Sequence, residues 1–147
     1  MKFLSFIYND VSSLGILHQN KSKIIDIHLS SKGELPNNML DYLNDFDENN
    51  SKLNNIISNN EQIIIDIDNV KLIAPLPNPV SFRDAYAFRQ HVEAGRKNRG
   101  LEMIPEYDDF PVFYFSNHNS ICGPGLVKVQ KNHLEQLDFE FEIAAVI

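Results

Sequence analysis

Acidic and apolar residues alternate along residues 137–147, and this pattern constrains the fold of the chain most. An alternation of period two predicts a β-strand, because successive side chains of a strand point to opposite faces. One face would carry apolar side chains and the other carboxylates: Phe139, Phe141 and Ile143, and Asp138, Glu140 and Glu142. Glu140 and Glu142 would lie about 7 Å apart, where they repel unless they are protonated, solvated or bridged by a cation. Two interpretations stay open, a solvated edge strand and half of a divalent-metal site.

The apolar run Ala144–Ile147 continues this strand, and we expect it to be buried on both faces. Backbone groups in such a run need hydrogen-bond partners, and no turn or cap residue follows. We therefore expect the 147 residues to be the N-terminal part of a longer protein.

The composition is that of a soluble globular protein, with 43% apolar and 22% charged residues. No apolar run approaches the roughly 20 residues of a membrane span, and the apolar stretch after Met1 is too short for a secretory signal. Cys122 stands alone, which excludes an internal disulfide and fits a reducing cytoplasm. The net charge of −7, without a basic cluster, argues against nucleic acid as a partner. The sequence predicts a cytoplasmic protein with no membrane or nucleic-acid partner.

The pattern of apolar residues over positions 1–69 predicts a small β-rich domain with a helical insert. Three short strands come first, the first two separated by turn-forming Asn9 and Asp10: Lys2–Tyr8, Ser13–His18 and Lys23–Leu29. Helical spacing follows in two groups: Met39, Leu40, Leu43 and Phe46, then Leu53, Ile56 and Ile57. Strand character returns over Glu61–Val70. No spacing ties His18 or His28 to a metal or nucleophile, and we interpret both as structural or surface residues.

Residues 70–79 run from a strand into three prolines, Pro75, Pro77 and Pro79. Such a segment is extended and stiff and cannot continue a helix. We therefore predict a domain boundary near residue 70, with a second domain over residues 70–147.

A helix is predicted over residues 81–92, capped by Ser81 with Asp84 as the acidic member of a capping box. His91 lies seven residues after Asp84, close to two helical turns, so the two side chains would share one face. The capping role of Asp84 and a functional Asp–His pair both stay open. Three cations then precede Gly100, where they would stabilise the helix end or receive an anionic substrate: Arg96, Lys97 and Arg99.

Asp108 and Asp109 follow Tyr107 before the next expected strand, and we interpret them as a solvated acidic turn. His118 and His133 lie in polar surroundings and are interpreted as surface residues.

Five short motifs follow one another along the second half of the chain: Val70–Pro75, Asp84–His91, Pro111–Asn117, Gly123–Gly125 and Leu137–Glu142. In this order and spacing they resemble the fumarylacetoacetate hydrolase family, in its long form with an N-terminal domain. All five motifs lie within residues 70–147, whereas residues 1–69 resemble the family only in their general layout. The resemblance implies an α+β, mainly β chain whose second domain is the first part of a mixed β-roll.

The resemblance also implies site residues. In this family carboxylates hold a divalent cation, Mg²⁺ or Ca²⁺ with Mn²⁺ as an alternative. The metal ligands match Asp84, Glu140 and Glu142, the catalytic histidine matches His91, and the substrate-binding residues match Tyr86, Tyr114 and Arg99, with Arg96 as an alternative to Arg99. A further metal-binding aspartate and a catalytic lysine are expected beyond Ile147.

The resemblance implies metal-dependent hydrolysis of a carbon–carbon bond in a fumarylacetoacetate- or acylpyruvate-like diketo acid. It also implies a role in the catabolism of aromatic compounds, and a homodimer for the full-length protein. Hard oxygen ligands suit such a cation, which acts as a Lewis acid. Histidine titrates near neutral pH, so His91 would take a proton from the attacking water. Isomerisation, decarboxylation or hydration of a related keto acid stays open, as does a catalytically incomplete fragment.

Overall fold

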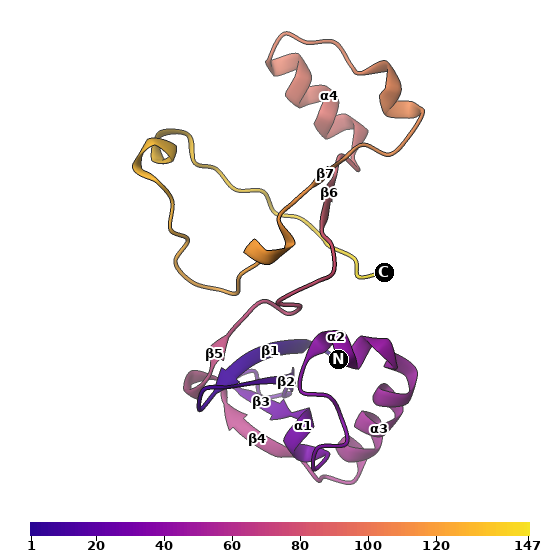
Figure 1. The fold of residues 1–147 in the computed structure, drawn as a ribbon, viewed down its shortest axis with the longest axis vertical. Helices are drawn as coiled ribbons and strands as arrows, with labels where there is room; N and C mark the ends of the chain where they lie inside the picture. Colours follow the sequence, from indigo (N-terminus) through magenta and orange to yellow (C-terminus); the bar gives the residue numbers. More distant parts are fainter.

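The computed structural model describes residues 1–147 and contains two antiparallel sheets, one on each side of the proline-containing segment (Figure 1). The first sheet has the order β4-β3-β2-β1-β5, and the second pairs β6 with β7. The strands are β1 (Phe3–Tyr8), β2 (Val11–Leu17), β3 (Lys23–Asp26), β4 (Ile63–Asp66), β5 (Lys71–Leu72), β6 (Arg83–Ala85) and β7 (Phe113–Phe115). The α-helices are α1 (Ile27–Ser30), α2 (Met39–Asn44), α3 (Phe46–Ser58) and α4 (Arg89–Asn98). Short 3-10 turns complete the chain: η1 (Ile67–Asn69), η2 (Pro105–Asp108), η3 (His118–Ser120) and η4 (Lys131–Gln136).

The fold is α+β. Helices are as prominent as strands, so the predicted mainly β character is too strong. The second sheet has two strands, and the mixed β-roll stays a prediction. Each helix in the structure is too short or too polar to span a lipid bilayer.

The hairpin of β1 and β2 is closed by Asn9 and Asp10, whose φ angles are 49° and 61°. Tyr8 pairs with Val11 across this turn. Positive φ at both central residues matches the right-handed twist of the strands, and Asn and Asp tolerate it better than other side chains. The predicted turn is confirmed.

The main core lies between the first sheet and helices α2 and α3 (Figure 1). Its buried members are Leu14, Ile16, Ile25, Ile27, Leu35, Met39, Tyr42 and Leu53. Ile24 joins a second cluster with Phe6 and Ile65, because neighbouring side chains of β3 point to opposite faces. Burial of one such aliphatic side chain contributes about 1.5–3 kcal/mol, so the two clusters hold this part of the chain together.

Gly15 of β2 lies in close contact with the neighbouring strand β3. A Cβ atom built at this position would lie 2.7 Å from both Ile24 Cγ2 and the carbonyl oxygen of Ile25. The sheet therefore requires glycine here for space.

Several predicted boundaries in the first half shift. Strand β3 ends at Asp26 instead of Leu29, because the Asp26 carboxylate accepts a hydrogen bond from Leu29 N (2.9 Å) and caps α1. The two predicted helical groups are confirmed, although Phe46 begins α3 instead of ending the first helix. The strand predicted over Glu61–Val70 is limited to β4, since η1 follows it directly.

Strand β5 pairs with β1 at Phe6 and Ile7, so the chain leaves the first sheet after residue 72. Ser5 Oγ then donates to Pro75 O (2.8 Å), and Ala74 is buried. These contacts attach the start of the proline-containing segment to the first sheet, and the domain boundary near residue 70 stays a prediction.

The helix predicted over residues 81–92 is wrong. Asp84 lies in β6 and pairs with Tyr114 of β7, while Phe88 has extended backbone angles (φ −106°, ψ 102°) and α4 begins at Arg89. Cross-strand pairing with a segment that lies far along the chain replaces the local capping box, so Asp84 is not a helix-capping residue.

The strand predicted over residues 137–147 is not formed, because no other strand pairs with this segment. Its side chains are exposed, including Phe141 (94%) and Ile143 (95%). The prediction that Ala144–Ile147 are buried is wrong for the same reason, since no sheet or helix covers them.

Candidate functional site

Strands β6 and β7 place Asp84 directly opposite Tyr114. Tyr86 follows β6, and its N–H donates to Val112 O (3.0 Å), which extends the pairing by one residue. Side chains opposite one another in an antiparallel pair point to the same face, and a residue two positions along the strand shares that face. The small sheet therefore gathers Asp84, Tyr86 and Tyr114, three of the predicted site residues.

The hydroxyls of Tyr86 and Tyr114 lie 3.0 Å apart, and their rings meet edge to face with centroids separated by 5.5 Å. The hydrogen bond with Tyr86 is the main cause that raises the pKa of Tyr114 above its usual range. The charge of Asp84 acts in the same direction and that of Arg99 opposes it. Tyr114 is therefore a neutral phenol near pH 7 that can donate a hydrogen bond, with Asp84 and Arg99 within electrostatic range.

Helix α4 carries His91 in its first turn, and His91 Nε2 lies 3.9 Å from Glu140 Oε1. The two residues are far apart in sequence, and both side chains are 68% exposed. An exposed pair of this kind contributes at most about 1 kcal/mol, even when the imidazole is protonated. The importance of this contact is structural, because it shows that the C-terminal segment lies beside α4.

Glu142 lies close to the other predicted carboxylates. Its pKa is raised above the usual range, first because its side chain shares a hydrogen bond with Glu140 and then because of the negative charge of Asp84. His91 acts in the opposite direction. Glu142 is therefore within electrostatic range of Asp84, His91 and Glu140, although these residues come from a strand, a helix and an extended segment.

The donor chemistry of this group fits a hard cation. No three His, Cys, Asp or Glu side chains in the structure are arranged to hold a metal ion. However, Asp84, Glu140 and Glu142 offer carboxylate oxygens, and a divalent cation would relieve the repulsion by Asp84 that contributes to the raised pKa of Glu142. Mg²⁺, Ca²⁺ and Mn²⁺ prefer such ligands over nitrogen or sulfur.

The two candidate arginines differ in their contacts. Arg96 Nε donates to the carbonyl oxygen of Glu102 and so holds the loop that follows α4. Arg99 Nε donates to Gly95 O (3.0 Å), and the charge of Arg99 reaches Tyr114. This geometry favours Arg99 over Arg96 as the arginine nearest to the tyrosine pair.

Sequence reasoning missed a group of contacts beside the site. Asp108 of η2 forms an ion pair with Arg89 (2.5 Å), and Tyr107 OH donates to Tyr86 O (2.8 Å). Asp108 is exposed, as expected for the solvated acidic turn that we predicted, but the prediction did not include its pairing with Arg89. No local spacing could reveal this pair, because Arg89 and Asp108 lie in different elements that meet only in the folded chain.

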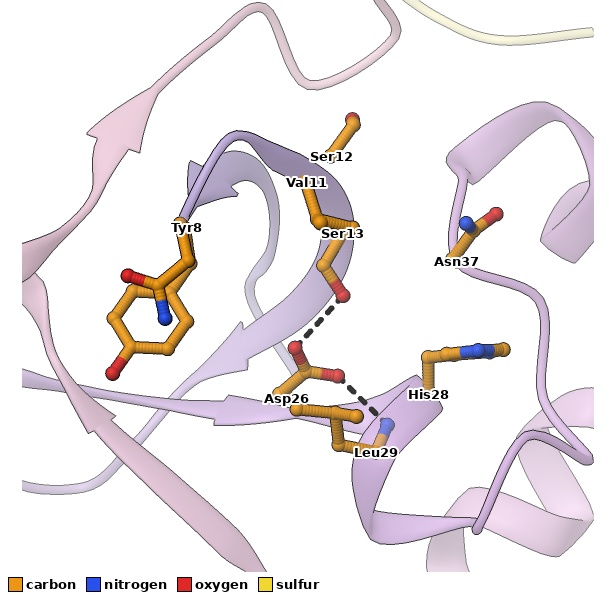
Figure 2. A pocket seen from close by; sticks show the side chains of 9 residues that line it. Tyr8, Val11, Ser12, Ser13, Asp26, His28, Leu29 and Asn37 are labelled. Carbon is orange, nitrogen blue, oxygen red and sulfur yellow. Dashed lines mark hydrogen bonds between the residues drawn. The ribbon is translucent and has the colours of Figure 1, made fainter.

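A cavity of about 270 Å³ lies beside the β1–β2 hairpin in the first half of the chain (Figure 2). The buried Asp26 carboxylate accepts hydrogen bonds from Ser13 Oγ (2.8 Å) and Leu29 N (2.9 Å) there. His28 Nδ1 lies 2.6 Å from Leu35 O. These bonds join β2, β3, α1 and the following loop, which agrees with the interpretation of His28 as a structural residue.

No known protein family profile matches the chain. A curated protein from Dictyostelium discoideum, described as a fumarylacetoacetate hydrolase domain-containing protein 2 homolog, is 27% identical to it over 151 residues. The match covers 100% of this chain and 46% of that protein, so the chain spans about half the length of its relative. Along its whole length, the chain is similar to part of a fumarylacetoacetate hydrolase domain-containing protein.

Proposed function

We propose that this chain carries active-site residues of a divalent-metal-dependent hydrolase of the fumarylacetoacetate hydrolase family, acting on a carbon–carbon bond of a fumarylacetoacetate- or acylpyruvate-like diketo acid. The observation that carries the proposal is the approach of His91 to Glu140, with Glu142 within electrostatic range of both and of Asp84. In this arrangement the imidazole would act as the proton acceptor, and the neighbouring carboxylates would bind the cation. The similarity to the Dictyostelium protein supports the same family.

Asp84, Glu140 and Glu142 would hold the cation, with Mg²⁺ or Ca²⁺ preferred and Mn²⁺ as an alternative. When bound, the cation supplies Lewis-acid polarisation of the substrate oxygens. Carboxylates bind cations in their ionised form, so the raised pKa of Glu142 would make cation binding weaken at a higher pH than an ordinary glutamate would.

The remaining residues would bind the substrate and move a proton. Arg99 would pair with the substrate carboxylate, and Tyr114 would donate a hydrogen bond from its neutral hydroxyl. His91 would accept a proton from water while the water oxygen adds to the carbonyl carbon. The carbon–carbon bond then breaks, its electron pair goes to the neighbouring carbon as an enolate, and the proton held by His91 returns to that product.

The test uses the 147-residue chain with a panel of acylpyruvates, and it monitors both substrate loss and products with added Mg²⁺ or Ca²⁺. We expect two new acids as products, with turnover abolished by a chelator and by His91→Ala. Glu61→Gln, which changes an acidic residue before β4 outside the site, is the matched control and should leave turnover unchanged. Calorimetry of Mg²⁺ binding to the wild type and to Glu140→Gln accompanies the assay.

The outcomes separate the alternatives. Turnover that persists with chelator and in His91→Ala refutes the hydrolase. A single product isomeric with the substrate, or release of carbon dioxide, replaces hydrolysis by the other keto-acid reactions. Stoichiometric Mg²⁺ binding without turnover supports the metal site but identifies the 147-residue chain as catalytically incomplete.

A further inference from the structure

Helix α4 begins without a capping side chain. Phe88 occupies the N-cap position and makes no side-chain hydrogen bond to the first turn, which also contains no acidic residue. The N–H groups of His91 and Val92 both donate to Phe88 O, at 3.0 and 3.2 Å. Uncapped helix ends fray readily, and His91 lies within this first turn.

The turn η2 contacts both sides of this helix start. On one side, Tyr107 OH donates to Tyr86 O (2.8 Å). On the other, Asp108 pairs with Arg89, whose guanidinium also lies 5.6 Å from the centroid of the Tyr107 ring. A guanidinium within about 6 Å of an aromatic ring is attracted to it. Two consecutive residues of η2 therefore hold residues 86 and 89, which enclose the junction between β6 and α4.

We infer that Tyr107, together with the Arg89–Asp108 pair, forms a clamp that replaces the missing helix cap and positions His91. An exposed ion pair alone would contribute little. Here a hydrogen bond, an ion pair and a cation–π contact all link η2 to the junction between β6 and α4. The entropic cost of ordering η2 is therefore shared by three interactions. The clamp fixes the backbone of Tyr86 on one side, where its hydroxyl meets Tyr114, and the start of α4 on the other. The catalytic consequence rests on the proposed function, whereas the clamp itself does not.

Amide hydrogen exchange of the 147-residue chain tests the clamp. Tyr107→Phe removes the bond to Tyr86 O and leaves the ring beneath Arg89, so we expect exchange of the His91 and Val92 amides to become about fivefold faster. Asp108→Asn, which removes the ion pair, should accelerate the same amides to a smaller extent. The amide of Asn49 in α3 is the internal control, and Tyr8→Phe, which changes a tyrosine of the first sheet, is the control variant.

The NMR signals of the His91 imidazole ring give a readout that mere loosening of η2 would not change. They should shift in Tyr107→Phe, while those of His18 stay in place. Unchanged exchange at His91 and Val92 overturns the clamp. Faster exchange confined to residues 104–110, with unmoved His91 ring signals, assigns Tyr107 to the stability of its own turn and overturns the positioning role. Absence of metal binding and turnover in the wild type would reject the proposed function and leave the exchange result standing.

Discussion

The hydroxyl of Tyr42 offers a sharp test of the packing in the main core. Tyr42 is fully buried, and its hydroxyl has no hydrogen-bond partner. Its ring packs against Phe3 and Phe46, with centroid distances of 5.1 and 6.1 Å. A buried hydroxyl without a partner costs about 1–3 kcal/mol, and phenylalanine keeps the ring contacts. We therefore expect Tyr42→Phe to raise the free energy of unfolding by about 1–2 kcal/mol at pH 7.

The same substitution should change how stability depends on pH. Burial raises the pKa of Tyr42 to about 12, whereas a tyrosine in an unfolded chain ionises near pH 10. Above pH 10 the unfolded chain therefore loses its proton first, and the folded state loses stability as the pH rises from about 10 towards 12. At pH 11 this loss amounts to about 1.4 kcal/mol, and the Tyr42→Phe variant cannot incur it because phenylalanine has no ionisable proton.

Urea unfolding monitored by circular dichroism at 222 nm, at pH 7 and pH 11, measures both effects. Tyr8→Phe is the control, because Tyr8 lies at the partly exposed end of β1. The stability gap between Tyr42→Phe and the wild type should widen by about 1.4 kcal/mol between the two pH values, while the control changes by less than about 0.5 kcal/mol. A destabilised Tyr42→Phe, or a gap that does not widen, would show that the hydroxyl is satisfied in solution.

Two further predictions concern the first sheet and the carboxylate site. Gly15→Ala should destabilise the chain by about 1–3 kcal/mol, measured by the same unfolding assay, because its new methyl group would meet the carbonyl oxygen of Ile25 at 2.7 Å; wild-type stability would contradict this close approach. The affinity for Mg²⁺, measured by calorimetry, should fall as the pH decreases from 7 to 5, starting at a higher pH than for an ordinary glutamate, because the pKa of Glu142 is raised and the bound form is ionised. Glu142→Gln should flatten this pH dependence and Glu61→Gln should not; equal profiles for all three proteins would refute the role of Glu142.

The first half of the chain could be predicted largely from local patterns. The turn at Asn9 and Asp10 and the two helices follow from short-range chemistry, which each segment carries in its own residues. The end of β3 could not be predicted in this way. Ile27 continues the apolar pattern of the strand, but Asp26 finds Leu29 N as a capping partner, and the first turn of a helix forms instead.

The second half was less predictable because its structure depends on distant pairing. Ser81 and Asp84 have the spacing of a capping box in the sequence. In the structure, however, Asp84 belongs to β6 and pairs with Tyr114 of β7. The Asp84–His91 pairing on one helix face was therefore wrong. The proximity of His91 to the carboxylates could be expected only from the resemblance to a known family, since Glu140 has no periodic relation to His91. Tyr107 gave no signal in the sequence, because its hydrogen bond is to a backbone atom.

The position of β4 at one edge of the first sheet has a consequence for how the protein behaves in concentrated solution. Ile63 and Ile64 are nearly half exposed, and an open edge rich in isoleucine can recruit a strand from another molecule. Three features oppose such recruitment. The strand is short, Ile63 N–H already donates to Ser30 Oγ (2.9 Å), and Glu61 and Asp66 place negative charges at its two ends. Charged residues at the ends of an apolar strand oppose edge-to-edge aggregation, so we expect neutralisation of both Glu61 and Asp66 to increase the tendency of the chain to aggregate.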